Sequence, residues 1–337
     1  MKKYIWLLIL ISLAVVQLHA GYYAGDFMVI GNGVRPLSMG GAFSAVANDC
    51  SAIYWNAAGL AQIRKSELSI NHSFLYGNLA SYDNFTFCKP LPNDVTVGIN
   101  WTRLSISDIP VFLEEHLIYN VDFRSSFLEF NLPGQPDDMI KSADDLFQIA
   151  FAKHLHKDLY LGWLFLELPV DFNFGISAKY LNRKIDEYKG SGIGFDASIL
   201  FKTSLAVIIG RSWLGEFAFG LNYQDISNTK ITWNTMSNHS DEVEDNVKLG
   251  FAVIQPIKKF NSELVIAADI DYIYDNCNHY GIEYKCKDLV SMRMGINDND
   301  FTTGLSVKLY DINIDYAFTT NVIGNTNRIG LRYEFDK

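Results

Sequence analysis

The feature that most constrains this chain is an alternation of apolar and polar residues, repeated in about fourteen short segments between Leu68 and Phe335. A strand that crosses a bilayer at a tilt needs about 9 to 11 residues, and its successive side chains face hydrocarbon and lumen in turn. The sequence therefore predicts an all-β fold: a transmembrane antiparallel β-barrel of about 14 strands.

The alternation is clearest in the second half of the chain. In two segments we expect one set of side chains to face lipid and the set between them to face the lumen. The expected lipid sets are Leu264, Ile266, Ala268, Ile270 and Tyr272, and Phe301, Thr303, Leu305, Val307 and Leu309. The expected lumen sets are Val265, Ala267, Asp269 and Asp271, and Thr302, Gly304, Ser306 and Lys308. His72 falls in a lipid-facing set, and a position at headgroup level is expected for it.

The lengths of the connections give an independent test, because bacterial barrels have short periplasmic turns and long extracellular loops. The two longest connections, 105 to 145 and 225 to 245, both follow odd-numbered strands, as this rule requires. The connections 156 to 167 and 203 to 214 are longer than periplasmic turns usually are, and Leu159 to Leu168 is an alternative extra strand. Strands are expected near 66–76, 80–90, 94–104, 146–155, 168–181, 191–202, 215–224, 246–256, 262–274, 278–286, 288–297, 300–310, 311–320 and 327–335.

The first twenty residues have the parts of a secretory signal peptide. Lys2 and Lys3 precede an apolar run, and His19-Ala20 leads into Gly21. We expect cleavage before Gly21, with a retained anchor as the alternative. The chain is then divided into a signal peptide (1–20), an N-terminal segment rich in Gly, Ala and Asn (21–65) and the barrel (66–337).

Composition excludes several classes of protein. Beyond residue 20 no window approaches the ~18 uninterrupted apolar residues of a spanning helix, which excludes a multi-helix inner-membrane protein. The chain has 28 basic and 38 acidic residues. Loss of Lys2 and Lys3 with the signal leaves 26 against 38, a net charge of −12, which argues against a nucleic-acid partner. The 18 Tyr and 23 Phe fit the aromatic girdles of a barrel in outer-membrane lipid.

Four cysteines are compatible with disulfides in an exported chain. Cys277 and Cys286 lie at opposite ends of one expected strand, roughly 30 Å apart at ~3.3 Å per residue, which is beyond disulfide reach. Cys50 and Cys88 are either bridged or free, and we favour free thiols.

The last expected strand carries a pattern of its own, with Arg328, Gly330, Tyr333 and Phe335 at a spacing of two, three and two residues. It resembles the signal that outer-membrane assembly machinery reads on terminal barrel strands, except that Asp336 and Lys337 follow the final aromatic residue. A terminal strand is an open edge until the barrel closes, so a partner can pair with it. Gly330, Tyr333 and Phe335 are therefore the candidate assembly signal.

The N-terminal segment contains the pattern G-x-R-x-x-x-M-G-G-A-F-x-A-V-A-x-D over residues 33–49, followed by W-N-A-A-G-L over residues 55–60. This resembles the N-terminal hatch of the FadL-like outer-membrane family, most of all its PorV/PorQ branch, with Ala57 where the family usually has Pro. The resemblance implies a hatch that folds inside the barrel and plugs it. The candidate hatch residues are Gly33, Arg35, Pro36, Met39, Gly40, Gly41, Asp49, Trp55, Asn56, Gly59 and Leu60.

Charges on the lumen face are candidates to hold this segment. Arg35 and Asp49 are expected to pair with wall residues such as Asp269, Asp315, Arg293 or Arg332, and Asp271 is a further candidate lumen charge. No catalytic residues, metal site or cofactor are expected. His154-x-His156 lacks accompanying ligands, and the glycine-rich 190–194 opens a strand where a phosphate site needs a helix.

Three functions are compatible with such a chain to different degrees. The resemblance implies passage of small hydrophobic molecules across the bacterial outer membrane, with capture by the loop residues Val111, Phe112, Leu113, Phe127 and Phe130. The alternative is a PorV-like, non-enzymatic component that binds exported proteins. A transporter should have an apolar cavity that runs from mouth to hatch, whereas a scaffold could have a packed lumen. An outer-membrane enzyme is disfavoured because no catalytic arrangement is present.

Overall fold

A computed structural model of the chain describes residues 25–111, 136, 138–162, 166–237, 239–272 and 277–335. The expected signal peptide and most of the long loop after residue 111 lie outside these residues. Within them, no helix is both long and apolar enough to cross a bilayer.

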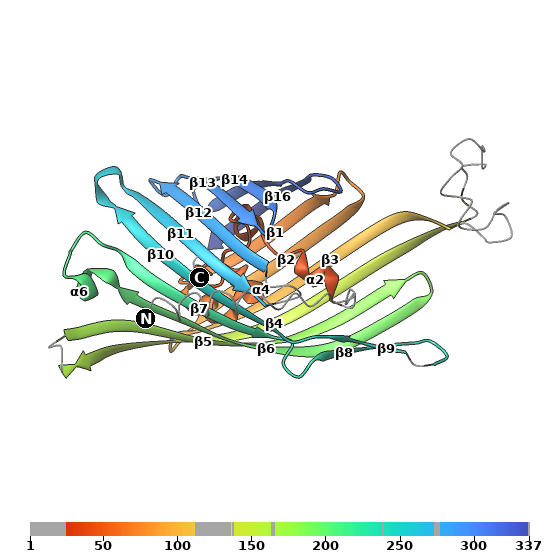
Figure 1. Cartoon of the computed structure of the whole chain (residues 1–337), viewed down its shortest axis with the longest axis horizontal. Helices are drawn as coiled ribbons and strands as arrows, with labels where there is room; N and C mark the ends of the chain where they lie inside the picture. Colours follow the sequence, from red (N-terminus) through yellow and green to blue (C-terminus); the bar gives the residue numbers. More distant parts are fainter. Residues whose placement is uncertain are drawn as a thin grey trace, which may run out of the picture.

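Fourteen strands close into an antiparallel barrel, so the predicted fold is confirmed (Figure 1). Each strand pairs with its neighbour along the chain, and β1 pairs with β16, with Ser66 opposite Phe335. The pairing of β5 with β6 completes the ring. The strands are β1 (Ser66–Leu75), β2 (Ala80–Leu91), β3 (Val95–Val111), β4 (Asp138–Leu161), β5 (Leu166–Ile185), β6 (Tyr188–Ser204), β7 (Glu216–Gln224), β10 (Asn246–Ile257), β11 (Ser262–Asp271), β12 (Cys277–Cys286), β13 (Val290–Asn297), β14 (Asp300–Leu309), β15 (Ile312–Thr319) and β16 (Thr326–Phe335).

The two ends of the barrel differ. We call the end at Ser66 and Phe335 the base and the opposite end, at Leu75 and Val111, the mouth. The long connections 112–137 and 225–245 both leave from the mouth, as expected from their place after odd-numbered strands.

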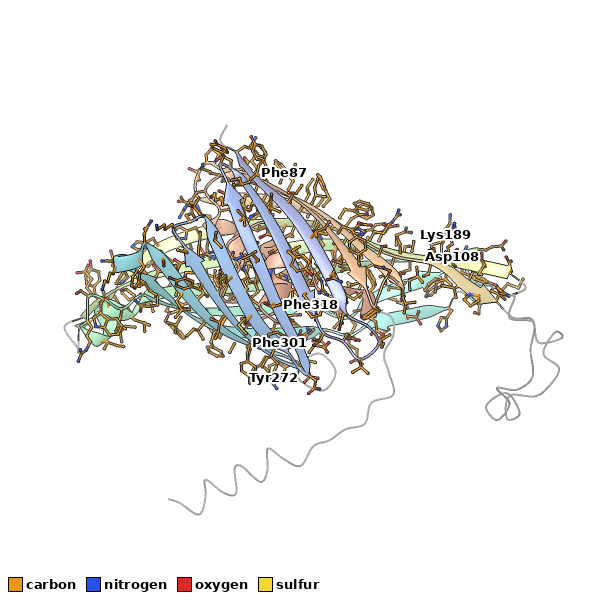
Figure 2. All side chains as sticks on the ribbon, turned by 90° about the horizontal axis from the view of Figure 1, so that it is seen from above. Phe87, Asp108, Lys189, Tyr272, Phe301 and Phe318 are labelled. Atoms are coloured by element: carbon orange, nitrogen blue, oxygen red, sulfur yellow. The ribbon has the colours of Figure 1, made fainter. Side chains whose placement is uncertain are left out.

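The predicted alternation is present in the strands. In β11, Val265, Ala267, Asp269 and Asp271 are buried, and Ile266 is half-exposed on the outer surface. β14 shows the same pattern, with Thr302 and Ser306 buried and Leu305 exposed. Figure 2 shows the side chains standing out from the strands, with Phe87 and Phe301 among the labelled outer residues. His72 also lies on the outer face, where its Nδ1 is 2.6 Å from the Asp83 carboxylate.

Three connections differ from expectation. The alternative extra strand at 159–168 is wrong, because β4 and β5 run on to Leu161 and Leu166 and form one long hairpin. The stretch 203–214 contains a short helix, α6 (Leu205–Ile209). The connection 225–245 holds a hairpin, β8 (Thr229–Trp233) and β9 (Ser240–Val243), that pairs with the mouth end of β6. β8 and β9 are too short for an alternation of apolar and polar residues to reveal them in the sequence.

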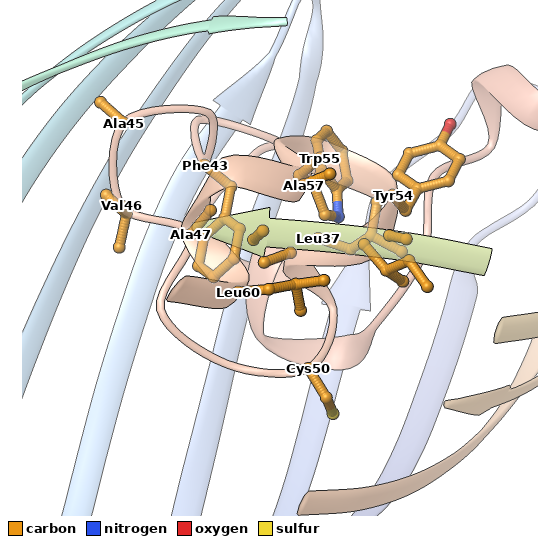
Figure 3. Close-up of a cluster of buried hydrophobic side chains, with 14 of the residues drawn as sticks. Leu37, Phe43, Ala45, Val46, Ala47, Cys50, Tyr54, Trp55, Ala57 and Leu60 are labelled. Atoms are coloured by element: carbon orange, nitrogen blue, oxygen red, sulfur yellow. The ribbon is translucent and has the colours of Figure 1, made fainter. Parts of the chain in front are cut away.

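Residues 25–65 lie inside the barrel, where most of their apolar side chains are buried (Figure 3). They form the short helices α2 (Asp26–Val29), α3 (Val34–Ser38), α4 (Ala52–Trp55) and η1 (Ala57–Gln62). α3 packs on β13 to β16, and η1 packs on β3 to β6. Because these strands are on opposite sides of the ring, the segment spans the lumen. Phe43, Met39, Ile53 and Leu60 are its largest fully buried side chains.

Candidate functional site

Two glycines of the N-terminal motif, Gly40 and Gly41, lie where the segment meets the wall, and Gly33 and Gly59 pack within the segment. Gly40 has φ of +66°, and a Cβ there would lie 2.5 Å from the carbonyl oxygen of Ile296 on β13. Glycine is therefore required for both its positive φ and the close approach. Gly33, also with positive φ, precedes α3, in which Pro36 is buried. Met39, Gly41 and Leu60 are buried in the same segment.

Asn56 links the segment to itself and to the wall. Its Nδ2 donates to the carbonyl oxygens of Ser44 (2.7 Å) and Ile199 (3.2 Å), and its Oδ1 accepts from the Ala58 amide (3.1 Å). The bond from the Ala58 amide caps η1, and the two donated bonds fix the Asn56 side chain, so the turn is held although Ala57 stands in place of proline. Trp55 donates its indole N–H to the Asn32 carbonyl oxygen at 2.7 Å, and Gly59 follows within η1.

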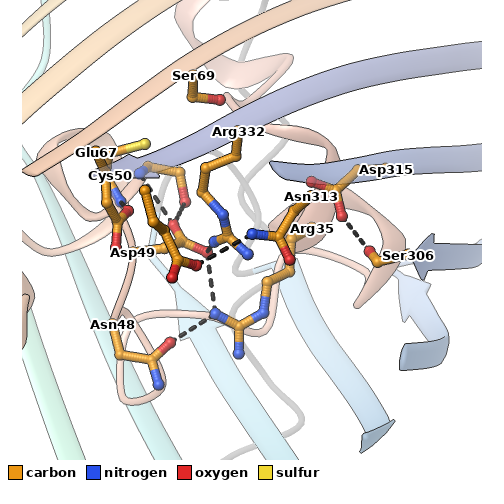
Figure 4. A network of polar contacts seen from close by, with 12 residues as sticks. Arg35, Asn48, Asp49, Cys50, Glu67, Ser69, Ser306, Asn313, Asp315 and Arg332 are labelled. Atoms are coloured by element: carbon orange, nitrogen blue, oxygen red, sulfur yellow. Dashed lines mark hydrogen bonds and ion pairs between the residues drawn. The ribbon is translucent and has the colours of Figure 1, made fainter. Parts of the chain in front are cut away.

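A charged network at the base joins the segment to the wall (Figure 4). Arg35 donates to Glu283 at 3.0 and 2.6 Å and to Asp49 at 3.0 Å. Asp49 also accepts from Arg332 at 2.7 Å. Arg293 continues the network, 2.6 Å from Glu283.

Of the wall charges expected from the sequence, Arg332 contacts Asp49 directly. Arg293 is joined to the network through Glu283, and Asp315 lies 3.6 Å from Arg293. Glu283, which binds two arginines, was not among the lumen charges predicted from the sequence. A signal for it existed, since it is an acid on the lumen face of its strand, in step with buried Gly281 and His279.

Two arginines control the ionisation of Asp49. Burial by itself would raise the pKa of this carboxyl group. The guanidinium groups of Arg332 and Arg35 outweigh burial and hold the pKa of Asp49 below its ordinary value. The carboxylate is thus charged at neutral pH and compensates the positive charges around it.

Asp269 holds the segment through its backbone. Its Oδ2 accepts from the amide groups of Phe43 (3.0 Å) and Ser44 (2.7 Å). Asp269 was one of several alternative wall partners for Arg35 and Asp49, which instead contact Glu283 and Arg332. Asp271, two residues on, forms an ion pair of 2.6 Å with Lys248.

A cavity of about 70 Å³ lies on the mouth side of the segment, between α2, the β8–β9 hairpin and strands β4, β10 and β11. We call it the mouth cavity. Its apolar lining includes Met28, Val29, Tyr54 and Val243. Its polar lining includes Lys179, which lies 2.7 Å from Asp225 and was not expected from the sequence.

A second cavity, of about 120 Å³, lies on the base side and is lined mainly by polar and charged residues, Arg35, Glu67, Glu283 and Arg332 among them. We call it the base cavity. The two lining sets share no residue. Residues of the N-terminal segment line both cavities. Tyr54 lines the mouth cavity and Arg35 lines the base cavity, so the segment lies between the two.

Several candidate residues fall elsewhere. Val111 ends β3 at the mouth, and Phe112, Leu113, Phe127 and Phe130 lie outside the described residues. On β16, Gly330 faces the lumen, whereas Tyr333 and Phe335 stack on the outside with ring centroids 5.3 Å apart. Cys50 and Cys88 are both free and buried.

In the described part of the chain, no group of three His, Cys, Asp or Glu side chains is placed to hold a metal ion. His154 and His156 contact Asn173 and Asp171, both at 2.7 Å. The glycine-rich residues 190–194 belong to the mouth end of β6, as expected.

Solved structures of similar fold include channels for aromatic hydrocarbons. The P. putida toluene transporter TodX matches with a TM-score of 0.53 and 10% identity, over 91% of this chain and 99% of TodX. The CymD monoaromatic hydrocarbon channel matches with a TM-score of 0.53 and 8% identity, over 91% and 98%. The Ralstonia pickettii toluene transporter TbuX matches with a TM-score of 0.50 and 11% identity, over 90% and 98%.

This chain shares the fold of these channels. The FadL-like resemblance is thereby supported at the level of the fold, and the PorV/PorQ assignment stays a hypothesis. No protein-family model matches the sequence, and no curated protein matches it.

Proposed function

We propose that this chain is a FadL-like channel of the bacterial outer membrane that passes small hydrophobic molecules, with residues 21–65 as its hatch. One observation carries the proposal: the N-terminal segment fills the barrel between a partly apolar mouth cavity and a charged base cavity. A barrel blocked in this way admits a solute only when the segment rearranges. The shared fold with two toluene transporters supports the substrate class.

In the proposed route, the apolar residues of the 112–130 loop capture the ligand, which then enters the mouth cavity beside Tyr54. The ion pairs of Arg35 and Asp49 hold the hatch closed at the base. The outward apolar side chains contact outer-membrane lipid. The proposal also includes export through a cleaved signal at residues 1–20 and insertion by the outer-membrane assembly machinery. It includes no enzymatic step, cofactor or metal.

The test compares a bacterial strain that lacks this chain with the same strain expressing it. Uptake of labelled toluene over seconds is the readout, and labelled arabinose is the control solute. We expect expression to raise toluene uptake several-fold and to leave arabinose uptake unchanged, because the closed hatch excludes polar solutes. Equal toluene uptake in the two strains would rule out the proposed transport.

A second candidate is the PorV-like role, in which the chain binds exported proteins at the outer membrane. The close packing of the lumen favours it, since Met39, Ala42, Phe43, Ala45 and Ala47 have no exposed surface. This role predicts that the strain lacking the chain releases fewer exported polypeptides into the medium, with toluene uptake unchanged. Quantitative comparison of the exported proteins distinguishes the two functions.

A further inference from the structure

The mouth cavity carries an excess of negative charge. Five carboxylate and two lysine side chains line it, an excess of three negative charges. Both lysines are already paired, Lys248 with Asp271 at 2.6 Å and Lys179 with Asp225 at 2.7 Å. The lysines therefore offer little attraction to a further anion.

The remaining three carboxylates lie at the rim. Glu242, Glu244 and Asp245 have exposed side chains beside β9, and the Asp245 carboxylate accepts a hydrogen bond from the Tyr223 hydroxyl at 2.7 Å. A ligand that approaches the cavity from the mouth meets these charges first. Charges of one sign around a cleft attract ligands of the opposite sign and repel those of the same sign.

The lining of the same cavity also includes a buried residue with an unpaired hydrogen-bond acceptor. Asn246 lines the cavity and is only 3% exposed. Its Nδ2 donates to Gln224 Oε1 at 3.3 Å, while its Oδ1 has no hydrogen-bond partner among the described residues. A buried acceptor without a donor is unfavourable, so an incoming N–H group would gain a bond there.

The other lining of the cavity is apolar or aromatic. Met28, Val29, Leu146 and Val243 contribute aliphatic surface, and Tyr54 contributes a buried ring. The Tyr54 hydroxyl already donates to the Met28 carbonyl oxygen, so the ring is held in place. One cavity thus combines an apolar wall, an unpaired acceptor and a negative rim.

We propose that the mouth cavity binds a small amphiphile with a cationic, hydrogen-bond-donating head and an apolar body, the chemistry of a primary arylalkyl amine. The ammonium group lies at Asn246 Oδ1 near the rim carboxylates, and the apolar body lies against Met28, Val243 and Tyr54. This inference rests on the proposed transport function, because it specifies the substrate class of the same site.

The test is calorimetric titration of the full chain in neutral detergent with three ligands of similar size: 2-phenylethylamine, phenylacetate and ethylbenzene. We expect 2-phenylethylamine to bind at least about tenfold more tightly than phenylacetate, with ethylbenzene between them. About 0.5 M NaCl should reduce this preference, because salt screens exposed charges.

Variants then identify the source of the preference. The double substitution Glu242→Gln with Glu244→Gln removes two exposed rim charges and should lower amine affinity severalfold without changing ethylbenzene affinity. Asn246→Ala should lower amine affinity too. Glu187→Gln, at the exposed tip between β5 and β6 and away from the cavity, is the matched control and should change neither affinity.

Two outcomes would overturn the inference. If phenylacetate binds as tightly as 2-phenylethylamine, or if the double rim variant keeps full amine affinity, the cavity does not select cations. Binding of ethylbenzene in either case would leave the proposed passage of hydrophobic molecules intact. Failure of all three ligands to bind, with the barrel folded by its heat-dependent gel mobility, would contradict both proposals.

Discussion

Arg332 Nη1 lies 2.7 Å from Asp49 Oδ2, which joins the last barrel strand to the N-terminal segment across 283 positions of sequence. Asp49 is 4% exposed and also contacts Arg35, so one carboxylate compensates two guanidinium groups. The contact exists only when β16 is in place beside β1. Seating of the segment and closure of the barrel are therefore coupled.

Asp49→Asn should destabilise the seated segment. The substitution leaves Arg332 and Arg35 largely buried with less compensation, and loss of one partner of a buried pair costs about 3–5 kcal/mol. Urea unfolding in detergent should detect the loss, and swelling of proteoliposomes in arabinose should reveal a leak. Lys65→Gln is the control, because the Lys65 side chain is 42% exposed and lies 3.8 Å from Asp311. Equal stability and equal leak in the two variants would contradict this role of Asp49.

Acid should weaken the same contact. The folded pKa of Asp49 is below that of the unfolded chain, about 3.9, so its contribution is complete above that pH and is lost as the pH falls further. We therefore expect the contribution of Asp49 to appear as a rise of the arabinose leak below about pH 4. The amide that replaces the carboxyl group in the Asp49→Asn variant cannot titrate, so this variant should show a smaller rise. An identical rise in both proteins would assign the acid effect to other groups.

Gly220 on β7 is required by close packing. A Cβ at this position would overlap the carbonyl oxygen of Ser44 in the segment. Gly220→Ala should cost about 1–3 kcal/mol and increase the arabinose leak, because the backbone of the segment must move away. The matched control is Gly162→Ala at the base hairpin, where a Cβ would meet no described atom within 4 Å. If the Gly220→Ala protein has the same arabinose leak and the same stability as the control, the close contact between Gly220 and Ser44 is not needed.

The buried thiols should resist labelling. Cys50 and Cys88 are 1% and 0% exposed, and burial raises the pKa of the Cys50 thiol well above its ordinary value. In a Cys277→Ser, Cys286→Ser protein, maleimide should label neither remaining thiol in the folded state and both after unfolding. Mass spectrometry counts the labels. Failure to label after unfolding without reductant would indicate a Cys50–Cys88 disulfide.

The terminal aromatic residue should matter for assembly in cells. Phe335 stacks on Tyr333 and also on Phe87 of β2, with centroids 6.2 Å apart. If assembly machinery reads this residue, Phe335→Ala should reduce the folded fraction in outer membranes more than it reduces spontaneous folding into lipid vesicles. Heat-dependent gel mobility measures both. Tyr316→Ala, which removes another outward ring, is the control, and an equal defect there would argue against a specific signal.

The strands and their faces could be predicted because alternation is a local property. β11 was expected at 262–274 and is found at 262–271, with Asp269 and Asp271 facing inward. The β8–β9 hairpin was missed because five and four residues are too few to establish a pattern. The register of β4 with β5 was also not predictable, since it depends on pairing that continues past the expected strand ends.

The sequence by itself determined that this chain forms a closed barrel with an apolar outer surface. The alternation of apolar and polar residues has a period of two, which assigns each side chain to one face of its strand wherever that strand lies. It also marked residues 33–60 as a separate segment. Only the tertiary structure decided which lumen groups meet, such as Glu283 with Arg35 or Lys179 with Asp225. These partners are far apart in sequence, and their distance depends on the register of every strand between them and on where the segment lies in the lumen.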